Sequence, residues 1–257
     1  MANQQEHIKS IIDQFTKQAV PFAQTPELSQ KEAFDLLLES TGVTSTDTVL
    51  DVACGPGIVA CEFAEKAQHV TGIDITPAMV EQAKKRQNEK KLSNLTWHLG
   101  DISPLPYSDN SFSMIITRFS FHHFNDPKAV LQEMIRVCKS GGTLMVADVA
   151  LPPEKVDAYN RVEKLKDPSH TRALTEIEFM EMAVELGIQD IQTFFFRVEM
   201  ELEAQLRSSF PNPGDEEIIR RMFREDLGKD NLGFGAHLVA GAIHIAYPIM
   251  VLKGKKP

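Results

Sequence analysis

Between residues 48 and 149 the chain alternates short apolar segments with longer amphipathic ones, and this alternation most limits the folds it can adopt. Short apolar segments bounded by turn residues are typical of buried strands, and amphipathic segments are typical of helices. Strands that alternate with helices form a parallel sheet through right-handed crossovers. The pattern therefore predicts an α/β fold with a doubly wound sheet. The predicted strands of this region are Thr48 to Ala53, Val70 to Asp74, Leu95 to Leu99, Phe112 to Phe119 and Gly142 to Val149.

The segments on either side of this region add helices and two more strands. Before it, apolar residues recur at helical spacing from Ile8 to Phe15 and from Leu28 to Leu38, which predicts N-terminal helices. After it, strands are predicted at 194–198 and 243–253, so the sheet is expected to have seven strands. The segment between these two strands, 201–241, is long for a connection and is expected to be a helical insertion that covers an active site.

Composition and charge exclude several classes of protein. Lys and Arg number 27 against 36 Asp and Glu, and the net charge of 27 − 36 = −9 repels a phosphate backbone, so nucleic acid is not an expected partner. The three cysteines form no C-x-x-C pair, which predicts a reducing compartment and no zinc site. The sequence contains neither a signal peptide nor an apolar run long enough for a membrane span. These features predict a cytoplasmic protein without a bound metal.

The segment from Val49 to Gly57, VLDVACGPG, carries the most information about function. It reads as a strand that runs into a glycine turn and opens a helix. Gly55 and Gly57 let the backbone approach a ligand where a side chain would collide. Together with Ala60 they also satisfy the G-x-G-x-x-A pattern of dinucleotide-binding folds, which leaves an NAD-dependent oxidoreductase open as an alternative.

Three aspartates lie at the ends of predicted strands. Asp51 is near the end of the first strand, Asp74 ends the second, and Asp101 follows the third. Ligands of open α/β sheets bind at the carboxyl ends of the strands, so we expect these three carboxylates to converge on one site. Asp51 would repel a pyrophosphate but attract an ammonium group. The pattern therefore favours a cationic nucleoside over a dinucleotide.

Together these residues resemble the class I S-adenosylmethionine-dependent methyltransferases, in particular the small-molecule branch that includes the ubiquinone and menaquinone biosynthesis C-methyltransferases. The resemblance covers roughly residues 45 to 150. It implies a Rossmann-like, mostly parallel sheet whose last strand is antiparallel. The segments that carry it are 49–57, 72–79, 100–112, 120–124 and 141–144.

The resemblance also implies a role for individual residues of the cofactor site. Asp74 would accept hydrogen bonds from both ribose hydroxyls, and Asp51 would attract the methionyl amino group directly or through water. Asp101 would accept a hydrogen bond from the adenine amine, and the Ile102 N–H would face a ring nitrogen. The residues implied to contact S-adenosylmethionine are Asp51, Ala53, Gly55, Gly57, Asp74, Ile75, Met79, Gly100, Asp101, Ile102, Phe119 and Ser120.

Methyl transfer from a sulfonium needs no metal and no covalent enzyme intermediate, because the methyl group is already activated. A base is needed only to deprotonate the acceptor. His122 and His123 follow the fourth strand, which places them near the methyl group, and histidine titrates in the useful range. His170 and Arg172 lie in a turn between helices and are further catalytic candidates. If none of these residues acts as a base, catalysis reduces to alignment of donor and acceptor.

The sequence as a whole predicts a single methyltransferase domain that spans residues 1–257. Residues 1–44 would form a helical lid, 45–150 the cofactor-binding core, and 151–257 the substrate-side helices and last strands. The expected acceptor is a small aromatic, phenolic or quinol molecule, methylated on carbon or oxygen. The protein is expected to act as a monomer or homodimer. A non-catalytic S-adenosylmethionine-binding protein stays open as a third possibility.

Overall fold

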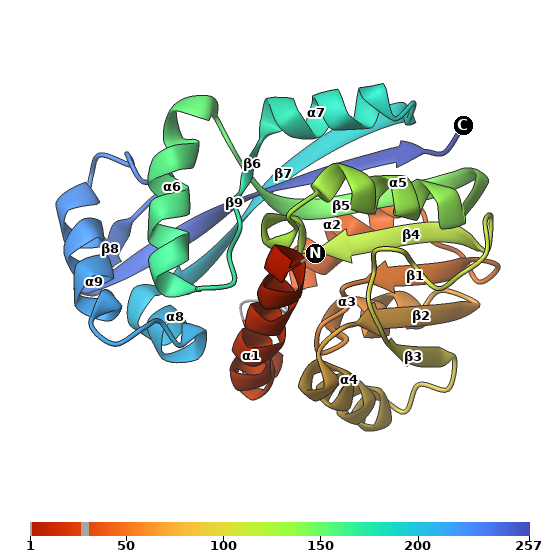
Figure 1. The fold of residues 1–257 in the computed structure, drawn as a ribbon, viewed down its shortest axis with the longest axis horizontal. Helices are drawn as coiled ribbons and strands as arrows, with labels where there is room; N and C mark the ends of the chain where they lie inside the picture. Colours follow the sequence, from red (N-terminus) through yellow and green to blue (C-terminus); the bar gives the residue numbers. More distant parts are fainter. Residues whose placement is uncertain (1, 27–30) are drawn as a thin grey trace.

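The computed structural model describes residues 2–26 and 31–257, and its central feature is one β-sheet with helices on both faces (Figure 1). Seven of its strands run in the order β3-β2-β1-β4-β5-β9-β7, while β6 pairs with β5 and β8 pairs with β9 off this path. The strands are β1 (Thr48–Val52), β2 (His69–Asp74), β3 (Leu95–Leu99), β4 (Phe112–Arg118), β5 (Cys138–Leu151), β6 (Leu174–Thr175), β7 (Gln189–Glu201), β8 (His237–Val239) and β9 (Ala242–Lys255).

The pairing of the strands sets where a ligand can bind. β1 is parallel to both β2 and β4, β3 is parallel to β2, and β4 is parallel to β5. β9 is antiparallel to both β5 and β7. The winding of the chain reverses between β1 and β4, which is the point where ligands bind in open α/β sheets. The predicted Rossmann-like α/β fold, with a mostly parallel sheet and an antiparallel last strand, is confirmed.

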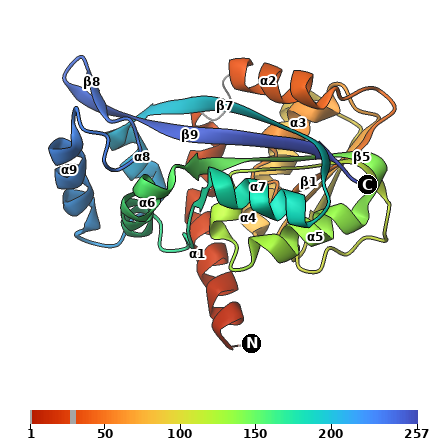
Figure 2. The same ribbon diagram turned by 90° about the horizontal axis from the view of Figure 1, so that it is seen from above.

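The strands are buried on both faces, and alternate residues reach different hydrophobic clusters. Val49 packs with residues of α2 and α3, whereas its neighbours Leu50 and Val52 pack with residues of α5 and α7. These two pairs of helices lie on opposite sides of the sheet (Figure 2). The helices are α1 (Ala2–Gln24), α2 (Lys31–Thr41), α3 (Ile58–Ala64), α4 (Pro77–Lys90), α5 (Pro127–Val137), α6 (Pro153–Lys166), α7 (Glu176–Glu185), α8 (Leu202–Ser209) and α9 (Asp215–Asp226), together with a 3₁₀ turn at Phe121–His123.

The first helix, α1, is hydrogen-bonded to α4 near its own end and to the last residue of α8. The Ala23 carbonyl accepts a hydrogen bond of 2.7 Å from Arg86 on α4, and the Gln14 amide donates one of 2.5 Å to the Ser209 carbonyl at the end of α8. Leu28, from the second N-terminal pattern, lies outside the described residues. Among the helices of residues 2–26 and 31–257, none is both long and apolar enough to cross a membrane.

Several element boundaries differ from the predicted ones. β5 begins at Cys138 rather than Gly142, and β7 spans Gln189–Glu201 rather than 194–198. β7 is an edge strand whose first residues are mostly exposed, so it is extended by backbone pairing with β9 and shows no apolar alternation there. The predicted insertion 201–241 does contain helices, α8 and α9, and ends in the short strand β8.

Candidate functional site

A cavity of about 590 Å³ lies at the carboxyl ends of β1, β2 and β4, and α1 covers part of it. Its volume is in the usual range for small-molecule sites. Apolar side chains from α1 and the strand ends line it together with a small number of polar groups. Residues that line it include His7, Ile8, Ile11, Phe15, Phe22, Ala53, Cys54, Gly55, Asp74, Ile75, Thr76, Met79, Asp101, Ile102, Arg118, Phe119, Ser120 and His123.

The glycine turn after β1 forms one wall of the cavity. Gly55 has a φ of +52°, and a Cβ at this position would have open space around it. Gly57 has a φ of +72° and does not line the cavity. A Cβ on Gly57 would lie 2.6 Å from Trp97 Cη2 and 2.9 Å from Ala83 Cβ. The structure therefore assigns Gly57 to close packing rather than to the predicted approach of a ligand.

Asp74 lies at the end of β2 and faces the cavity. Its Oδ2 accepts a hydrogen bond of 2.9 Å from the Gly55 N–H, and its Oδ1 accepts one of 2.8 Å from the Thr76 N–H. Burial raises the pKa of Asp74, although the Thr76 and Gly55 N–H groups oppose the shift. Each oxygen keeps a lone pair for a second donor. The carboxylate can therefore hold the glycine turn and bind two ligand hydroxyls at once.

Asp51 is placed differently from the sequence-based expectation. It is 2% exposed and does not line the cavity. Its Oδ2 has no hydrogen-bond partner among the described residues. Burial raises the pKa of Asp51 to about 8, although the backbone N–H of Ala60 and the Arg118 guanidinium favour its charged form. A direct contact with a ligand amino group is not available in this arrangement.

Asp101 lies at the exposed rim of the cavity, after β3. Its Oδ1 accepts hydrogen bonds from the Ile102 N–H at 2.7 Å and from the Ser103 N–H at 3.1 Å. The Ile102 N–H, which the resemblance assigned to an adenine nitrogen, is therefore engaged within its own turn here. Gly100 does not line the cavity. Of the predicted cofactor residues, those that line it are Ala53, Gly55, Asp74, Ile75, Met79, Asp101, Ile102, Phe119 and Ser120.

A second, smaller pocket of about 110 Å³ adjoins the cavity and shares Phe15, Phe22, Phe119 and His123 with it. We refer to it as the inner pocket. A larger share of its lining side chains is polar than in the larger cavity. Buried or half-buried polar residues that line it include Gln18, His122, His123, Glu163, Lys166, Asp167, Ser209 and Tyr247.

Opposite charges compensate one another on one wall of the inner pocket. Lys166 Nζ lies 2.6 Å from Glu163 Oε1 and 2.8 Å from the Tyr247 hydroxyl. Burial opposes the charge on Lys166, but Glu163 outweighs it and keeps the pKa of Lys166 above its usual value. Asp167 has no ion-pair partner among the described residues and accepts hydrogen bonds from Ser169 and Gln18. The inner pocket therefore has an excess of carboxylate.

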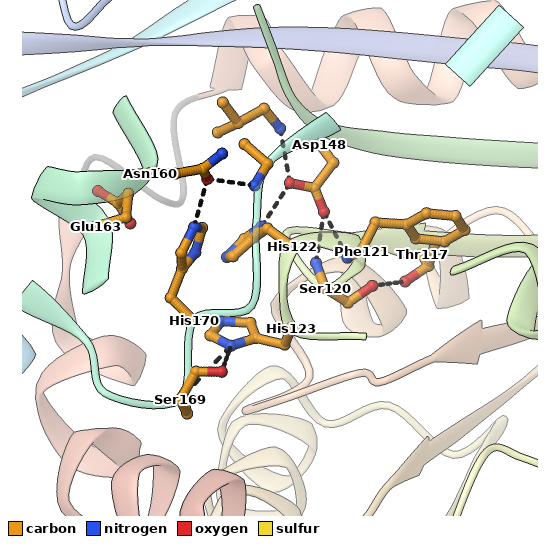
Figure 3. Close-up of polar contacts among 12 residues, drawn as sticks. Thr117, Ser120, Phe121, His122, His123, Asp148, Asn160, Glu163, Ser169 and His170 are labelled. Carbon is orange, nitrogen blue, oxygen red and sulfur yellow. Dashed lines mark hydrogen bonds and ion pairs between the residues drawn. The ribbon is translucent and has the colours of Figure 1, made fainter. Parts of the chain in front are cut away.

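His122 lines the inner pocket and forms an ion pair with Asp148 at the end of β5. His122 Nδ1 lies 2.6 Å from Asp148 Oδ1. Burial opposes the charged form of His122, but the Asp148 carboxylate outweighs it, so the pKa of His122 is above its ordinary value. Figure 3 shows the His122 ring between Asp148 and His170. Of the four catalytic candidates, His122 has a buried carboxylate partner and lines a pocket.

The other three candidates have different surroundings. His123 lines both pockets, and burial together with repulsion from His122 lowers its pKa to about 4. His170 lines neither pocket, and burial lowers its pKa; its Nε2 lies 2.8 Å from Asn160 Oδ1. Arg172 also lines neither pocket and pairs with Glu178 at the surface. The structure does not bring Arg172 to the site.

Two residues of the site were missed by the sequence-based reasoning. Asp148 lies near the end of the predicted strand 142–149, and the rule that selected Asp51 and Asp74 at strand ends would have selected it too. Arg118 ends β4 and lines the cavity, where its guanidinium lies 4.2 Å from the Phe119 ring centre. Burial lowers the pKa of Arg118 to about 10, opposed by Asp51. No pattern in an apolar strand signals that a terminal arginine will be buried.

No group of three or more histidine, cysteine, aspartate or glutamate side chains in the described ranges is arranged to hold a metal ion. The cluster of His122, His123 and His170 is included in this finding. Its rings lie 4.3 to 6.3 Å apart, measured between centroids.

The strand order and the cavity at the reversal between β1 and β4 define an α/β protein with a ligand site at the carboxyl ends of its parallel strands. A family model described as a methyltransferase domain matches residues 43–223. The chain belongs to this methyltransferase family and is an S-adenosylmethionine-dependent methyltransferase.

Individual relatives resemble this chain in sequence, and solved structures resemble it in fold. The uncharacterized methyltransferase YcgJ of Bacillus subtilis is 30% identical over 212 residues, which cover 81% of this chain and 83% of the relative. Its crystal structure superposes with a TM-score of 0.80 over 88% of this chain and 99% of that one, at 24% identity. A demethylmenaquinone methyltransferase of Renibacterium salmoninarum is 33% identical over 117 residues, about half of each chain. A phosphoethanolamine-type N-methyltransferase of Haemonchus contortus, solved with S-adenosylhomocysteine, has a TM-score of 0.63 at 17% identity, over 88% of this chain and 53% of that one.

Proposed function

We propose that the protein binds S-adenosylmethionine in the larger cavity and transfers its methyl group to a small acceptor in the inner pocket. Family membership supports the reaction type, and the position of Asp74 supports the cofactor. Asp74 is a buried carboxylate at the end of β2 that lines the cavity, and each of its oxygens can accept a hydrogen bond beyond the backbone one it already has. This is the observation that carries the proposal.

The residues that line the cavity fit the chemical groups of this cofactor. Asp74 would accept hydrogen bonds from the ribose hydroxyls, and the open space at Gly55 would receive the methionyl chain. Ile75 and Met79 offer apolar surface for the adenine, and Asp101 offers a carboxylate at the rim. Arg118 supplies a cation for the methionyl carboxylate. When bound, the cofactor supplies a sulfonium methyl group that is already electrophilic.

The acceptor is proposed to be a small aromatic, phenolic or quinol molecule, methylated on carbon or oxygen. The inner pocket supports this because it combines aromatic side chains with hydrogen-bonding groups, and it adjoins the cofactor cavity through Phe119 and His123. Its volume of about 110 Å³ suits one end of such a molecule rather than a long chain. Phe15 and Phe22 on α1 line both spaces, so α1 is proposed to act as the lid.

The experiment that tests the proposed function is a calorimetric titration with S-adenosylmethionine and S-adenosylhomocysteine, followed by an acceptor screen. NAD serves as the control for the oxidoreductase alternative. Binding of both methionine nucleosides without NAD binding is expected, and S-adenosylhomocysteine is expected to accumulate with a phenol or a quinol in the screen. Binding of NAD alone would contradict the cofactor assignment. Binding without transfer to any acceptor would favour a non-catalytic binding protein.

A further inference from the structure

The two ring nitrogens of His122 have different surroundings. Nδ1 lies 2.6 Å from Asp148 Oδ1, whereas Nε2 makes no hydrogen bond to any of the described residues. The His122 side chain lines the inner pocket and is 16% exposed. A carboxylate can only accept hydrogen bonds, so the proton of the neutral ring is on Nδ1 and the lone pair is on Nε2. The neutral form of His122 is thus prepared to accept a proton at Nε2, and the Asp148 carboxylate makes it a stronger base.

Asp148 is held so that it cannot turn away from His122. Its Oδ2 accepts hydrogen bonds from the Ser120 N–H at 2.8 Å and the Phe121 N–H at 2.7 Å, and its Oδ1 accepts one from the Val149 N–H at 2.7 Å (Figure 3). The side chain is 1% exposed. Burial opposes ionisation of Asp148, but His122 and these N–H donors outweigh it and keep its pKa below the ordinary value. Asp148 therefore stays charged and fixes the orientation of the imidazole.

The other charged groups near His122 determine which net charge an acceptor in the inner pocket can carry. Glu163 and Lys166 on α6 lie on the same pocket, and they neutralise each other at 2.6 Å. Asp167, which has no ion-pair partner among the described residues, then leaves the pocket with an excess of negative charge. An acceptor that is already anionic would be repelled, whereas a neutral hydroxyl compound would not.

We propose that the inner pocket binds the hydroxyl-bearing end of a neutral phenol-type acceptor, that His122 Nε2 removes its proton, and that Asp148 positions His122. This inference rests on the proposed function and adds the acceptor subsite and its base. The acceptor O–H bond breaks, and its proton passes to His122 Nε2. The electron pair left on the acceptor forms a bond to the methyl carbon, and the carbon–sulfur bond breaks with its electrons on sulfur. His122 then loses the proton to water.

The experiment uses 4-nitrophenol as a probe, because its anion is yellow and its neutral form is nearly colourless. The full-length protein is saturated with S-adenosylhomocysteine at a pH about one unit below the pKa of the free phenol, where only roughly a tenth of it is ionised. We expect 4-nitrophenol to bind and to become mostly anionic when bound. 4-Nitrobenzoate, a permanent anion of similar shape, is expected to bind at least ~10-fold more weakly.

Variants separate proton transfer from simple binding of an anion. His122→Gln is expected to bind 4-nitrophenol in its neutral form, and Asp148→Asn is expected to lower the ionised fraction several-fold while S-adenosylhomocysteine affinity stays within about twofold of the wild type. Arg224→Ala, which removes an exposed cation outside both pockets, should behave as the wild type. If Asp148→Asn does not fold, His122→Gln alone decides.

The outcomes distinguish this inference from the proposed function. A protein that does not bind S-adenosylhomocysteine contradicts the proposed function and with it the inference. If S-adenosylhomocysteine binds but 4-nitrophenol does not, or binds un-ionised to the wild type, only the inference is overturned. The same holds if His122→Gln still ionises the bound phenol, or if 4-nitrobenzoate binds as tightly as 4-nitrophenol.

Discussion

Replacing Asp74 with alanine is the most direct test of the cofactor site. Each carboxylate oxygen of Asp74 already accepts one backbone N–H and can accept a second hydrogen bond. Loss of the carboxylate would therefore remove two charge-assisted hydrogen bonds to the ribose and part of the support of the glycine turn. A hydrogen bond to a charged group contributes about 1.5 to 3 kcal/mol, and water partly replaces it in the variant. We expect S-adenosylhomocysteine affinity to fall by about 2 to 4 kcal/mol, which is roughly 30- to 1,000-fold.

The assay is calorimetric titration of the wild type and Asp74→Ala with S-adenosylhomocysteine. Asp157→Ala is the matched control, because Asp157 is an exposed aspartate on α6 that lines neither pocket. Its affinity should equal that of the wild type. Asp74→Ala also leaves the Gly55 and Thr76 N–H groups without their acceptor, so circular dichroism must show that the variant is folded at the titration temperature. An affinity within about twofold of the wild type in a folded Asp74→Ala protein would refute the assignment of Asp74 to the cofactor.

Further predictions concern stability. Because burial raises the pKa of Asp51 to about 8, the folded protein binds a proton that the unfolded chain releases near pH 4, so stability is lost as pH rises toward and through 8. Asp51→Asn should therefore gain melting temperature relative to the wild type, and the gain should be larger at pH 8 than at pH 5; a gain that does not change with pH would contradict this. Gly57→Ala should lower the free energy of unfolding by at least ~2 kcal/mol, since its Cβ would lie 2.6 Å from Trp97, whereas Gly55→Ala, with open space around its Cβ, should lose less in urea denaturation. Thr175→Ala should lower the free energy of unfolding by about 1 kcal/mol in the same assay, because Thr175 caps α7 in a capping box with Glu178. An unchanged free energy of unfolding would show that this cap does not stabilise the protein.

The residues that line the larger cavity at the strand ends were largely predictable because their signals are local. A glycine turn directly after a buried strand, and an acid at the next strand end, are separated by short and regular distances along the chain. Parallel strands place their carboxyl ends at one edge, so Asp74 and Asp101 had to meet once the α/β fold was established. The same reasoning also predicted ligand contacts for Asp51 and Gly57, which do not line the cavity. The pattern does not show whether a residue faces the cavity or the helices packed behind the sheet.

The inner pocket was much less predictable because its residues come from distant parts of the chain. Gln18 from α1 and Tyr247 from β9 line one pocket of about 110 Å³, and no spacing in the sequence relates them. Arg172 and His170 are two residues apart, yet one lies at the surface and the other is buried. Such differences depend on how α6 and the following turn pack against the sheet.

The sequence by itself determined the α/β fold, the methyltransferase resemblance and the presence of Asp74 at a strand end, since periodicity and turn chemistry act over a few residues. Only the tertiary structure decided which histidine has a base-like environment. His122 and His123 are neighbours with the same intrinsic chemistry, but the pKa of His122 is raised by Asp148, 26 residues away, while burial and repulsion lower that of His123. Electrostatic surroundings are set by contacts across the fold, which a linear pattern does not contain.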